Sequence, residues 1–213
     1  MGSEIERALE EALLALDSDG VMSLVQHVVD DAATSPKQAV DAIAAAMDVV
    51  GRRFQEGEWF LGELVYSGTI ARNAMDQLAP LLSADQALEK LGKVVVGTIE
   101  GDMHDLGKSI FVNYARSAGF EVVDLGVNVP VSAFAEAAIE HQPVALGMCC
   151  LLTPAAGGVA SVVDELQSRG LRERTRVILG GAAMTAEFAD EIGADAYAPD
   201  AVTGTDILRE WTS

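Results

Sequence analysis

The residues most able to do chemistry lie in the stretch GTIEGDMHDLGKSI, where a histidine sits between two aspartates. His104 is one of three histidines in the chain, and Asp102 and Asp105 lie two positions before it and one after it. A carboxylate in this place can bind one ring nitrogen and leave the other free as a base or a metal ligand. Gly101 and Gly107 allow a large ligand or a helix to approach closely. By itself, the pattern is also that of a polar loop in which Asp105 begins a helix.

Two further stretches, CCLLTP at 149–154 and GGAAMT at 180–185, each follow a run of hydrophobic residues. Alone they are typical of a strand end with buried cysteines and of a glycine turn. Together with the His104 stretch they fall at the carboxyl ends of three predicted strands. Such ends meet at one edge of a parallel sheet, where ligands bind in doubly wound folds.

The elements that must position these stretches occupy residues 93–213. Short β-rich runs alternate with helical patterns, and the runs lack the alternating polarity of a half-exposed strand. This order predicts an α/β domain with a doubly wound, flavodoxin- or Rossmann-like, five-stranded parallel sheet. The predicted strands are 93–99, 120–126, 144–150, 176–181 and a weak 195–199; the predicted helices are 106–119, 130–142, 157–170 and 185–193.

The first 82 residues read as helix throughout. Hydrophobic residues recur at three- and four-residue steps, and Ser35 followed by Pro36 is typical of a helix start. Short connections separate four such segments, which predicts a small antiparallel four-helix bundle over residues 1–82. Residues 83–92 are the predicted linker to the α/β domain at 93–213.

The composition excludes several classes of protein. The 33 acidic residues outnumber the 14 basic ones, and the net charge of −19 makes nucleic acid and anionic membranes poor partners. No apolar run approaches the length of a membrane span, and the acidic N-terminus is unlike a signal peptide. Two adjacent cysteines are too few for a disulfide framework or a zinc cluster. A cytoplasmic location is therefore expected.

The spacing of the three stretches carries a resemblance to a known family. Asp102-x-His104-x-x-Gly107, Cys149-x-Leu151 and the pair Gly180-Gly181 are similar, at these separations, to the cobalamin-binding signature Asp-x-His-x-x-Gly, Ser-x-Leu, Gly-Gly. The stretch FQEGEWFLGELVYSGTIARNAM resembles the helical cap of methionine synthase and of the small corrinoid proteins of methyltransferase systems. Mutase modules generally lack that cap. The resemblance covers nearly the whole chain.

The resemblance implies a bound cobalamin or related cobamide and assigns the site. It implies that His104 is the lower axial ligand of cobalt, the single metal-binding residue, and that Asp102 holds its other nitrogen; these two would be the catalytic residues. The remaining implied cofactor-binding residues line the channel of the nucleotide tail or flank the histidine: Asp105, Gly107, Cys149, Leu151, Thr153, Gly180 and Gly181.

The resemblance also assigns the helical half. It implies that Phe54, Leu61 and Leu64 form an apolar lid over the upper face of the cofactor, where the methyl group is carried. The alternative is that these three side chains are ordinary bundle core. Methyl transfer then requires the lid to move aside so that a partner can reach the cobalt.

Two positions depart from the family pattern. Cys149 stands where the family has a serine that hydrogen-bonds the buried base, and a thiol is a weak donor. The tail is then held less tightly, or the native cobamide carries a different base. Ala155 stands where methionine synthase has a serine that extends the His–Asp network, so the relay is expected to stop at Asp102 or at water.

The function implied by the resemblance is that of a methyl-carrier subunit in a multi-component methyltransferase, cycling between cobalt(I) and methylcobalt(III). The expected partners are a substrate-specific methyltransferase, an acceptor methyltransferase acting on tetrahydrofolate or a thiol, and a reductive activase. Without them the subunit is not expected to be catalytic. A cobalamin-dependent sensor and a cobamide storage or delivery protein are the alternatives.

Overall fold

The computed structural model describes residues 2–31, 35–82 and 91–213. The chain divides into two compact units, the first helical and the second α/β, with the division near residue 91. Most of the predicted linker, 83–90 out of 83–92, lies outside the described residues. The exact domain bounds of the sequence analysis therefore stay a prediction.

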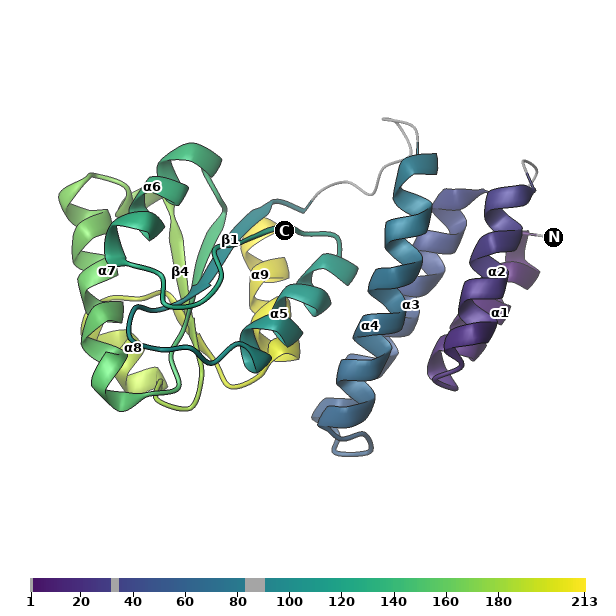
Figure 1. Ribbon diagram of the computed structural model, residues 1–213, viewed down its shortest axis with the longest axis horizontal. Coiled ribbons are helices and arrows are strands. Elements are labelled where there is room, and N and C mark those ends of the chain that lie inside the picture. Colours follow the sequence, from purple (N-terminus) through teal and green to yellow (C-terminus); the bar gives the residue numbers. More distant parts are fainter. Residues whose placement is uncertain (1, 32–34, 83–90) are drawn as a thin grey trace. The chain divides into compact units, whose positions relative to one another are not determined.

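The helical unit contains α1 (Gly2–Leu14), α2 (Ser18–Asp30), α3 (Pro36–Gln55) and α4 (Leu61–Leu78), and a 3-10 turn, η1 (Ala79–Leu81), follows α4 (Figure 1). Helix α1 packs against α2 and α3, and α4 packs against the same two helices. The four-helix arrangement expected from the hydrophobic periodicity is confirmed.

Local signals explain where these helices begin. The carboxylate of Asp17 accepts a hydrogen bond from the backbone N–H of Gly20 at 2.9 Å and caps α2. Glu63 accepts one from the backbone N–H of Phe60 at 3.1 Å, just before α4. Ser35 and Pro36 do precede and begin α3, but the Ser35 side chain makes no capping hydrogen bond. The start of α3 therefore depends on the fixed φ of proline.

The α/β unit is built on a five-stranded sheet in the order β2-β1-β3-β4-β5, with every neighbouring pair parallel. The strands are β1 (Lys93–Thr98), β2 (Glu121–Asp124), β3 (Ala145–Cys149), β4 (Arg176–Gly180) and β5 (Ala196–Ala198). All five predicted strands are present, and each is one to three residues shorter than expected. The order reverses between β1 and β3, which places a topological switch point there.

Helices cover both faces of this sheet (Figure 1). In chain order they are α5 (Leu106–Ser117), α6 (Val131–His141), α7 (Ala156–Ser168), α8 (Ala186–Ile192) and α9 (Ala201–Thr212). Helices α6, α7 and α8 lie on one face, and α5 and α9 lie on the other. Short 3-10 turns, η2 (Thr153–Ala155) and η3 (Arg172–Arg174), precede and follow α7. Helix α9 lies beyond the four predicted helices of this unit, and Asp200 caps it by accepting from the Thr203 N–H at 2.8 Å.

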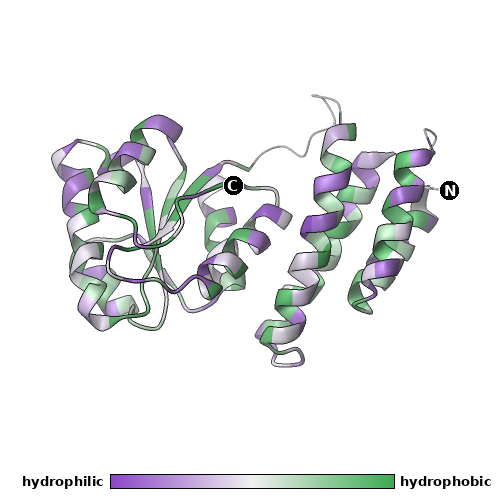
Figure 2. Ribbon diagram, in the orientation of Figure 1, coloured by the Kyte–Doolittle hydropathy of each residue, from purple (hydrophilic) through white to green (hydrophobic). Residues whose placement is uncertain are grey.

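One face of the sheet forms a hydrophobic core with α6 and α7. Phe134 of α6, Leu146 and Met148 of β3, and Leu166 of α7 are almost fully buried. Gly97 of β1 lets α6 approach, because a Cβ there would lie about 3.0 Å from the Phe134 ring. Figure 2 shows the helices of each unit with alternating hydrophobic and hydrophilic bands, as one-sided packing requires. No described helix is long and apolar enough to cross a membrane.

Candidate functional site

Four loops meet at the carboxyl edge of the sheet, because all strands run in the same direction. They follow β1, β2, β3 and β4 and span residues 99–105, 125–130, 150–155 and 181–185. Thr98, Cys149 and Gly180 are register partners across β1, β3 and β4, so the ends of these strands lie side by side. The three stretches singled out in the sequence therefore do come together at one edge.

His104 and Asp102 form a direct pair in the loop after β1. The Nδ1 atom of His104 lies 2.7 Å from Oδ1 of Asp102, and the same oxygen accepts the His104 backbone N–H at 2.9 Å. The carboxylate therefore holds both the ring and the backbone of the histidine. The Asp-x-His spacing produced the interaction that it predicted.

The carboxylate of Asp102 is fully buried and bound from a second loop. Its other oxygen, Oδ2, accepts the backbone N–H groups of Leu151 at 2.6 Å and of Leu152 at 3.1 Å. Burial alone would raise the pKa of Asp102, but these two amides and the two hydrogen bonds from His104 lower it to about 2. Asp102 is therefore ionised at neutral pH.

An ionised carboxylate can only accept hydrogen bonds, so the neutral ring of His104 must carry its proton on Nδ1. The lone pair is then on Nε2. The His104 side chain is 54% exposed, and no described residue donates to or accepts from Nε2. This nitrogen is free to act as a metal ligand or a base, and the carboxylate behind the ring fixes its orientation.

The loop that carries the pair is held by its neighbours. The hydroxyl of Thr98 donates to the His104 carbonyl at 3.0 Å. On the other side, Asn128 of the loop after β2 accepts the Gly101 N–H at 2.8 Å and donates its own backbone N–H to the Asp102 carbonyl at 3.0 Å. The histidine loop is therefore bonded to β1 and to two other loops.

A buried lysine paired with two carboxylates lies beside the pair. The Nζ atom of Lys108 lies 2.6 Å from both carboxylate oxygens of Asp124 and 2.8 Å from Oδ1 of Asp105. Lys108 is almost fully buried, which alone would lower its pKa, yet the two carboxylates raise the pKa above the ordinary value. Hydrogen bonds from Lys108 and Ser109 lower the pKa of Asp105. Asp105 is thus engaged within the chain, at the start of α5.

Cys149 and the two glycines lie at the ends of β3 and β4. Burial raises the pKa of the Cys149 thiol to about 12, so the thiol stays protonated at neutral pH and remains a hydrogen-bond donor. Gly181 has a φ of 104°, and a Cβ there would collide with the Cys150 carbonyl oxygen. Gly180 precedes it as the last residue of β4. The second glycine of the predicted pair is therefore required by the fold itself.

The surface around His104 is unusually apolar for a loop edge. Met103 and Leu106 flank the histidine in sequence, and Leu151 and Leu152 carry the amides that bind Asp102; all four side chains are exposed. Exposed apolar side chains around a free ligand nitrogen suit a large, flat and partly apolar ligand.

Gly107 is consistent with a ligand of this kind. It is the second residue of α5, and a Cβ added there would meet no heavy atom within 4 Å. Glycine inside a helix costs about 1 kcal/mol relative to alanine. The protein's own packing does not require this glycine, and its role toward a ligand stays a prediction.

The remaining predicted residues are placed as follows. Thr153 begins η2 in the loop after β3 and is exposed. In the helical unit Leu64 is buried, Phe54 is half-buried and Leu61 is 49% exposed. Whether the last three cover a ligand depends on the other unit, so the lid stays a prediction.

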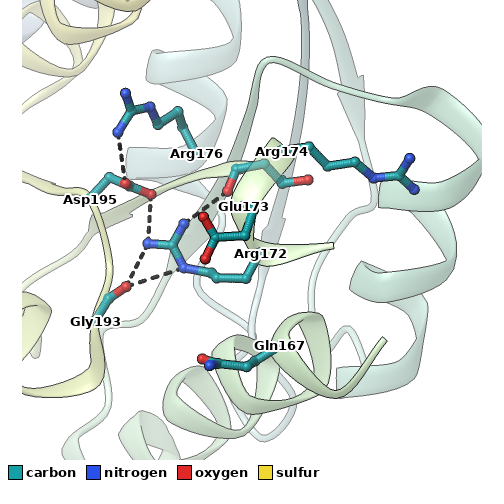
Figure 3. Close-up of a pocket in the computed structure, with 8 residues that line it drawn as sticks. Gln167, Arg172, Glu173, Arg174, Arg176, Gly193 and Asp195 are labelled. Atoms are coloured by element: carbon teal, nitrogen blue, oxygen red, sulfur yellow. Dashed lines mark hydrogen bonds and ion pairs between the residues drawn. The ribbon is translucent and has the colours of Figure 1, made fainter. Parts of the chain in front are cut away.

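A polar cleft of about 580 Å³ lies at the opposite, amino-terminal edge of the sheet (Figure 3). Three of its charged groups are paired with one another: Asp195 contacts Arg172 at 2.8 Å and Arg176 at 3.1 Å. Arg172 also donates to the Gly193 carbonyl at 3.2 Å. These contacts join η3 and β4 to the segment before β5, so the cleft has a structural explanation and is remote from His104.

Sequence reasoning missed several residues of the site: Thr98, Met103, Leu106, Lys108, Asp124, Asn128 and Leu152. Only Asn128 had a visible signal, because an asparagine between Gly126 and Pro130 is typical of a turn. No feature of the neighbouring sequence predicts that Lys108, in the first turn of α5, is buried.

The fold and the site together define a class. A parallel sheet with a ligand-type histidine at its switch point, preceded by a helical unit, is a ligand-binding α/β protein with an appended bundle. Two family models, both described as B12 binding domain, match the chain, one over residues 92–205 and one over residues 5–79. The chain therefore belongs to the B12-binding family, which confirms the resemblance and the cobamide as its cofactor.

Similar proteins extend this assignment over the full length. A dimethylamine corrinoid protein of Methanosarcina barkeri is 36% identical over 208 residues, or 97% of each chain. A cobalamin-binding protein from Desulfitobacterium hafniense has a TM-score of 0.78 and 35% identity, covering 97% of this chain and 98% of that one. A chain of the methanol:cobalamin methyltransferase complex of Methanosarcina barkeri has a TM-score of 0.85 and 26% identity, covering 98% and 80%. Relatives of this kind support a corrinoid methyl-carrier role.

Proposed function

We propose that this protein is the methyl-carrying corrinoid subunit of a multi-component methyltransferase and that His104 is the lower axial ligand of its cobalt. The observation that carries the proposal is the His104–Asp102 pair. A fully buried carboxylate holds Nδ1 at 2.7 Å and leaves Nε2 unbonded among exposed apolar side chains.

When bound, the cobamide supplies the methyl-transfer chemistry, with its cobalt alternating between cobalt(I) and methylcobalt(III). The protein's residues do the rest. His104 ligates, Asp102 fixes the ring tautomer, and the backbone amides of Leu151 and Leu152 keep Asp102 ionised. Phe54, Leu61 and Leu64 of the helical unit are proposed to exclude water and oxidant from the reactive face.

Methyltransferases are the proposed partners. The similar chain with the higher TM-score comes from a methyltransferase complex. The dimethylamine corrinoid protein is similar to this chain over 97% of its own length. We propose docking in turn with a substrate-specific methyltransferase, an acceptor methyltransferase that uses tetrahydrofolate or a thiol, and a reductive activase. The methyl donor is decided by the first partner. The cytoplasmic location stays a prediction.

Electron paramagnetic resonance on the protein loaded with cobalt(II) cobalamin tests the proposal. Protein labelled with nitrogen-15 histidine should show a superhyperfine pattern different from that of unlabelled protein. The His104→Gln variant should lose this difference, whereas His27→Gln and His141→Gln, which change the other two histidines, should keep it. A pattern that is insensitive to the label in wild-type protein would contradict histidine ligation and favour storage or sensing.

A further inference from the structure

Asn128 lies outside the predicted site and makes two hydrogen bonds to the histidine loop. It belongs to the loop after β2, and residues 99 and 129 form an isolated parallel bridge that brings this loop beside the end of β1. Asn128 has a φ of 54°, a left-handed value that asparagine tolerates better than most residues.

The left-handed backbone lets Asn128 bind two successive parts of the loop at once. Its side-chain oxygen accepts the Gly101 N–H at 2.8 Å, and its backbone N–H donates to the Asp102 carbonyl at 3.0 Å. These two bonds enclose the peptide unit between Gly101 and Asp102. The oxygen assignment follows because an N–H donor requires an acceptor.

Within the histidine loop, the Asp102 N–H donates to the Ile99 carbonyl at 3.1 Å. This bond closes a turn in which Gly101 has a φ of 85°. The backbone of Asp102 is thus fixed by Asn128, while its carboxylate is fixed by Leu151 and Leu152. Loops on either side of β1 therefore hold the backbone of Asp102 and its Oδ2 atom, and His104 is bonded to the other carboxylate oxygen, Oδ1.

From this geometry we propose that Asn128 is a positioning residue, which sets the tautomer and direction of the His104 ring by orienting Asp102. The proposal deepens the proposed function, since it concerns the same histidine, but the tautomer is a property of the protein without cofactor. Its consequences can therefore be measured separately from cobalt ligation.

The test compares two variants at position 128 with a control variant at position 142. Asn128→Gly keeps the left-handed backbone but removes the acceptor of the Gly101 N–H. Asn128→Asp keeps both the left-handed backbone and the acceptor of the Gly101 N–H. Gln142→Gly is the matched control, because Gln142 also has a left-handed φ, of 44°, and bonds the chain only through its own helix end. All three are compared with wild type at pH 8, where an ordinary histidine is neutral.

The first readout is nitrogen-15 resonance of the labelled His104 ring in cofactor-free protein, assigned by the signal lost in His104→Gln. The ratio of the Nδ1–H to the Nε2–H tautomer should fall about fivefold in Asn128→Gly, as expected for one hydrogen bond. Asn128→Asp and Gln142→Gly should keep the wild-type ratio. An unchanged ratio in Asn128→Gly, or an equal fall in Gln142→Gly, overturns the proposal.

The second readout is hydrogen exchange of the Gly101 amide, which also decides the matter if Asn128→Gly does not fold. The wild-type amide should be protected although it lies at an exposed turn, and exchange at the unprotected rate overturns the proposal. The ratio of histidine-bound to histidine-free cobalt(II) should also fall about fivefold in Asn128→Gly. If wild-type cobalt shows no histidine signal, the proposed function fails, while the tautomer ratio still decides the role of Asn128.

Discussion

The Nδ1 atom of His104 lies 2.7 Å from a carboxylate oxygen of Asp102, and the second oxygen of that carboxylate accepts two backbone amides from a loop about 50 residues further along the chain. This relationship joins two of the three stretches that the sequence marked. It decides the charge of Asp102, the tautomer of His104 and the direction of the free nitrogen.

Replacing Asp102 by asparagine should weaken cobamide binding about 10- to 100-fold, the usual cost of losing the partner of a ligating histidine. The NH₂ group of the asparagine would face either the N–H groups of Leu151 and Leu152 or the N–H of His104. In both orientations donors would face each other without an acceptor. Titration of the protein with cobalamin measures the effect. Asp164→Asn, on the exposed face of α7, is the control and should bind like wild type.

The stability of the cofactor-free protein should depend on Asp102 in acid. The pKa of Asp102 is lowered in the fold from 3.8 to about 2, so its contribution is complete above about pH 4 and is lost as the pH falls toward 2. The difference is worth about 2 kcal/mol. Urea unfolding at pH 5 and pH 2 should show wild type losing about 2 kcal/mol more than Asp102→Asn. Parallel losses in the two proteins would show that the carboxylate is not held as described.

Gly181→Ala should destabilise the protein by about 3 kcal/mol, because the left-handed φ and the Cys150 carbonyl oxygen both exclude a Cβ. Gly157→Ala, on α7, is the matched control, since a Cβ there meets nothing within 4 Å. It should leave the free energy of unfolding within about 1 kcal/mol of wild type, on the stabilising side. Equal effects of the two substitutions in thermal unfolding would contradict the described turn.

Gly107→Ala separates folding from binding at one residue. The cofactor-free protein should gain up to about 1 kcal/mol, since alanine favours the helix and nothing in the chain obstructs it. Cobalamin affinity should fall roughly tenfold, or about 1.4 kcal/mol, if the space beside Gly107 is filled by the cofactor. Unchanged affinity would show that Gly107 does not face the ligand.

Leu61→Ala tests the proposed lid. Leu61 is half exposed at the start of α4, so truncation should cost less than about 1 kcal/mol of stability, whereas Leu64→Ala should cost about 2–5 kcal/mol because Leu64 is buried. If Leu61 shields the upper face, protein loaded with methylcobalamin should lose its methyl group faster in light when Leu61 is truncated. Photolysis at the wild-type rate would show that Leu61 has no part in the lid.

The sequence was sufficient for the types of most elements and for the edge of the sheet where the site lies. The change from helical periodicity to hydrophobic runs is a local pattern, and parallel strands bring their carboxyl ends together whatever their order. It missed α9, whose start depends on the Asp200 cap. The predicted start of α3 at Ser35 and Pro36 is confirmed.

The sequence by itself determined the residue types and spacings of the site: Asp102 two positions before His104, a glycine at 107, and a glycine pair at the end of the fourth strand. Only the tertiary structure decided how they act. The amides that keep Asp102 ionised, the asparagine that binds its loop and the Asp124 carboxylate that pairs with buried Lys108 come from loops and strands 16 to 50 residues away. Such contacts depend on which strands are neighbours. They leave no local pattern, because a hydrogen bond is decided by distance in space rather than in sequence.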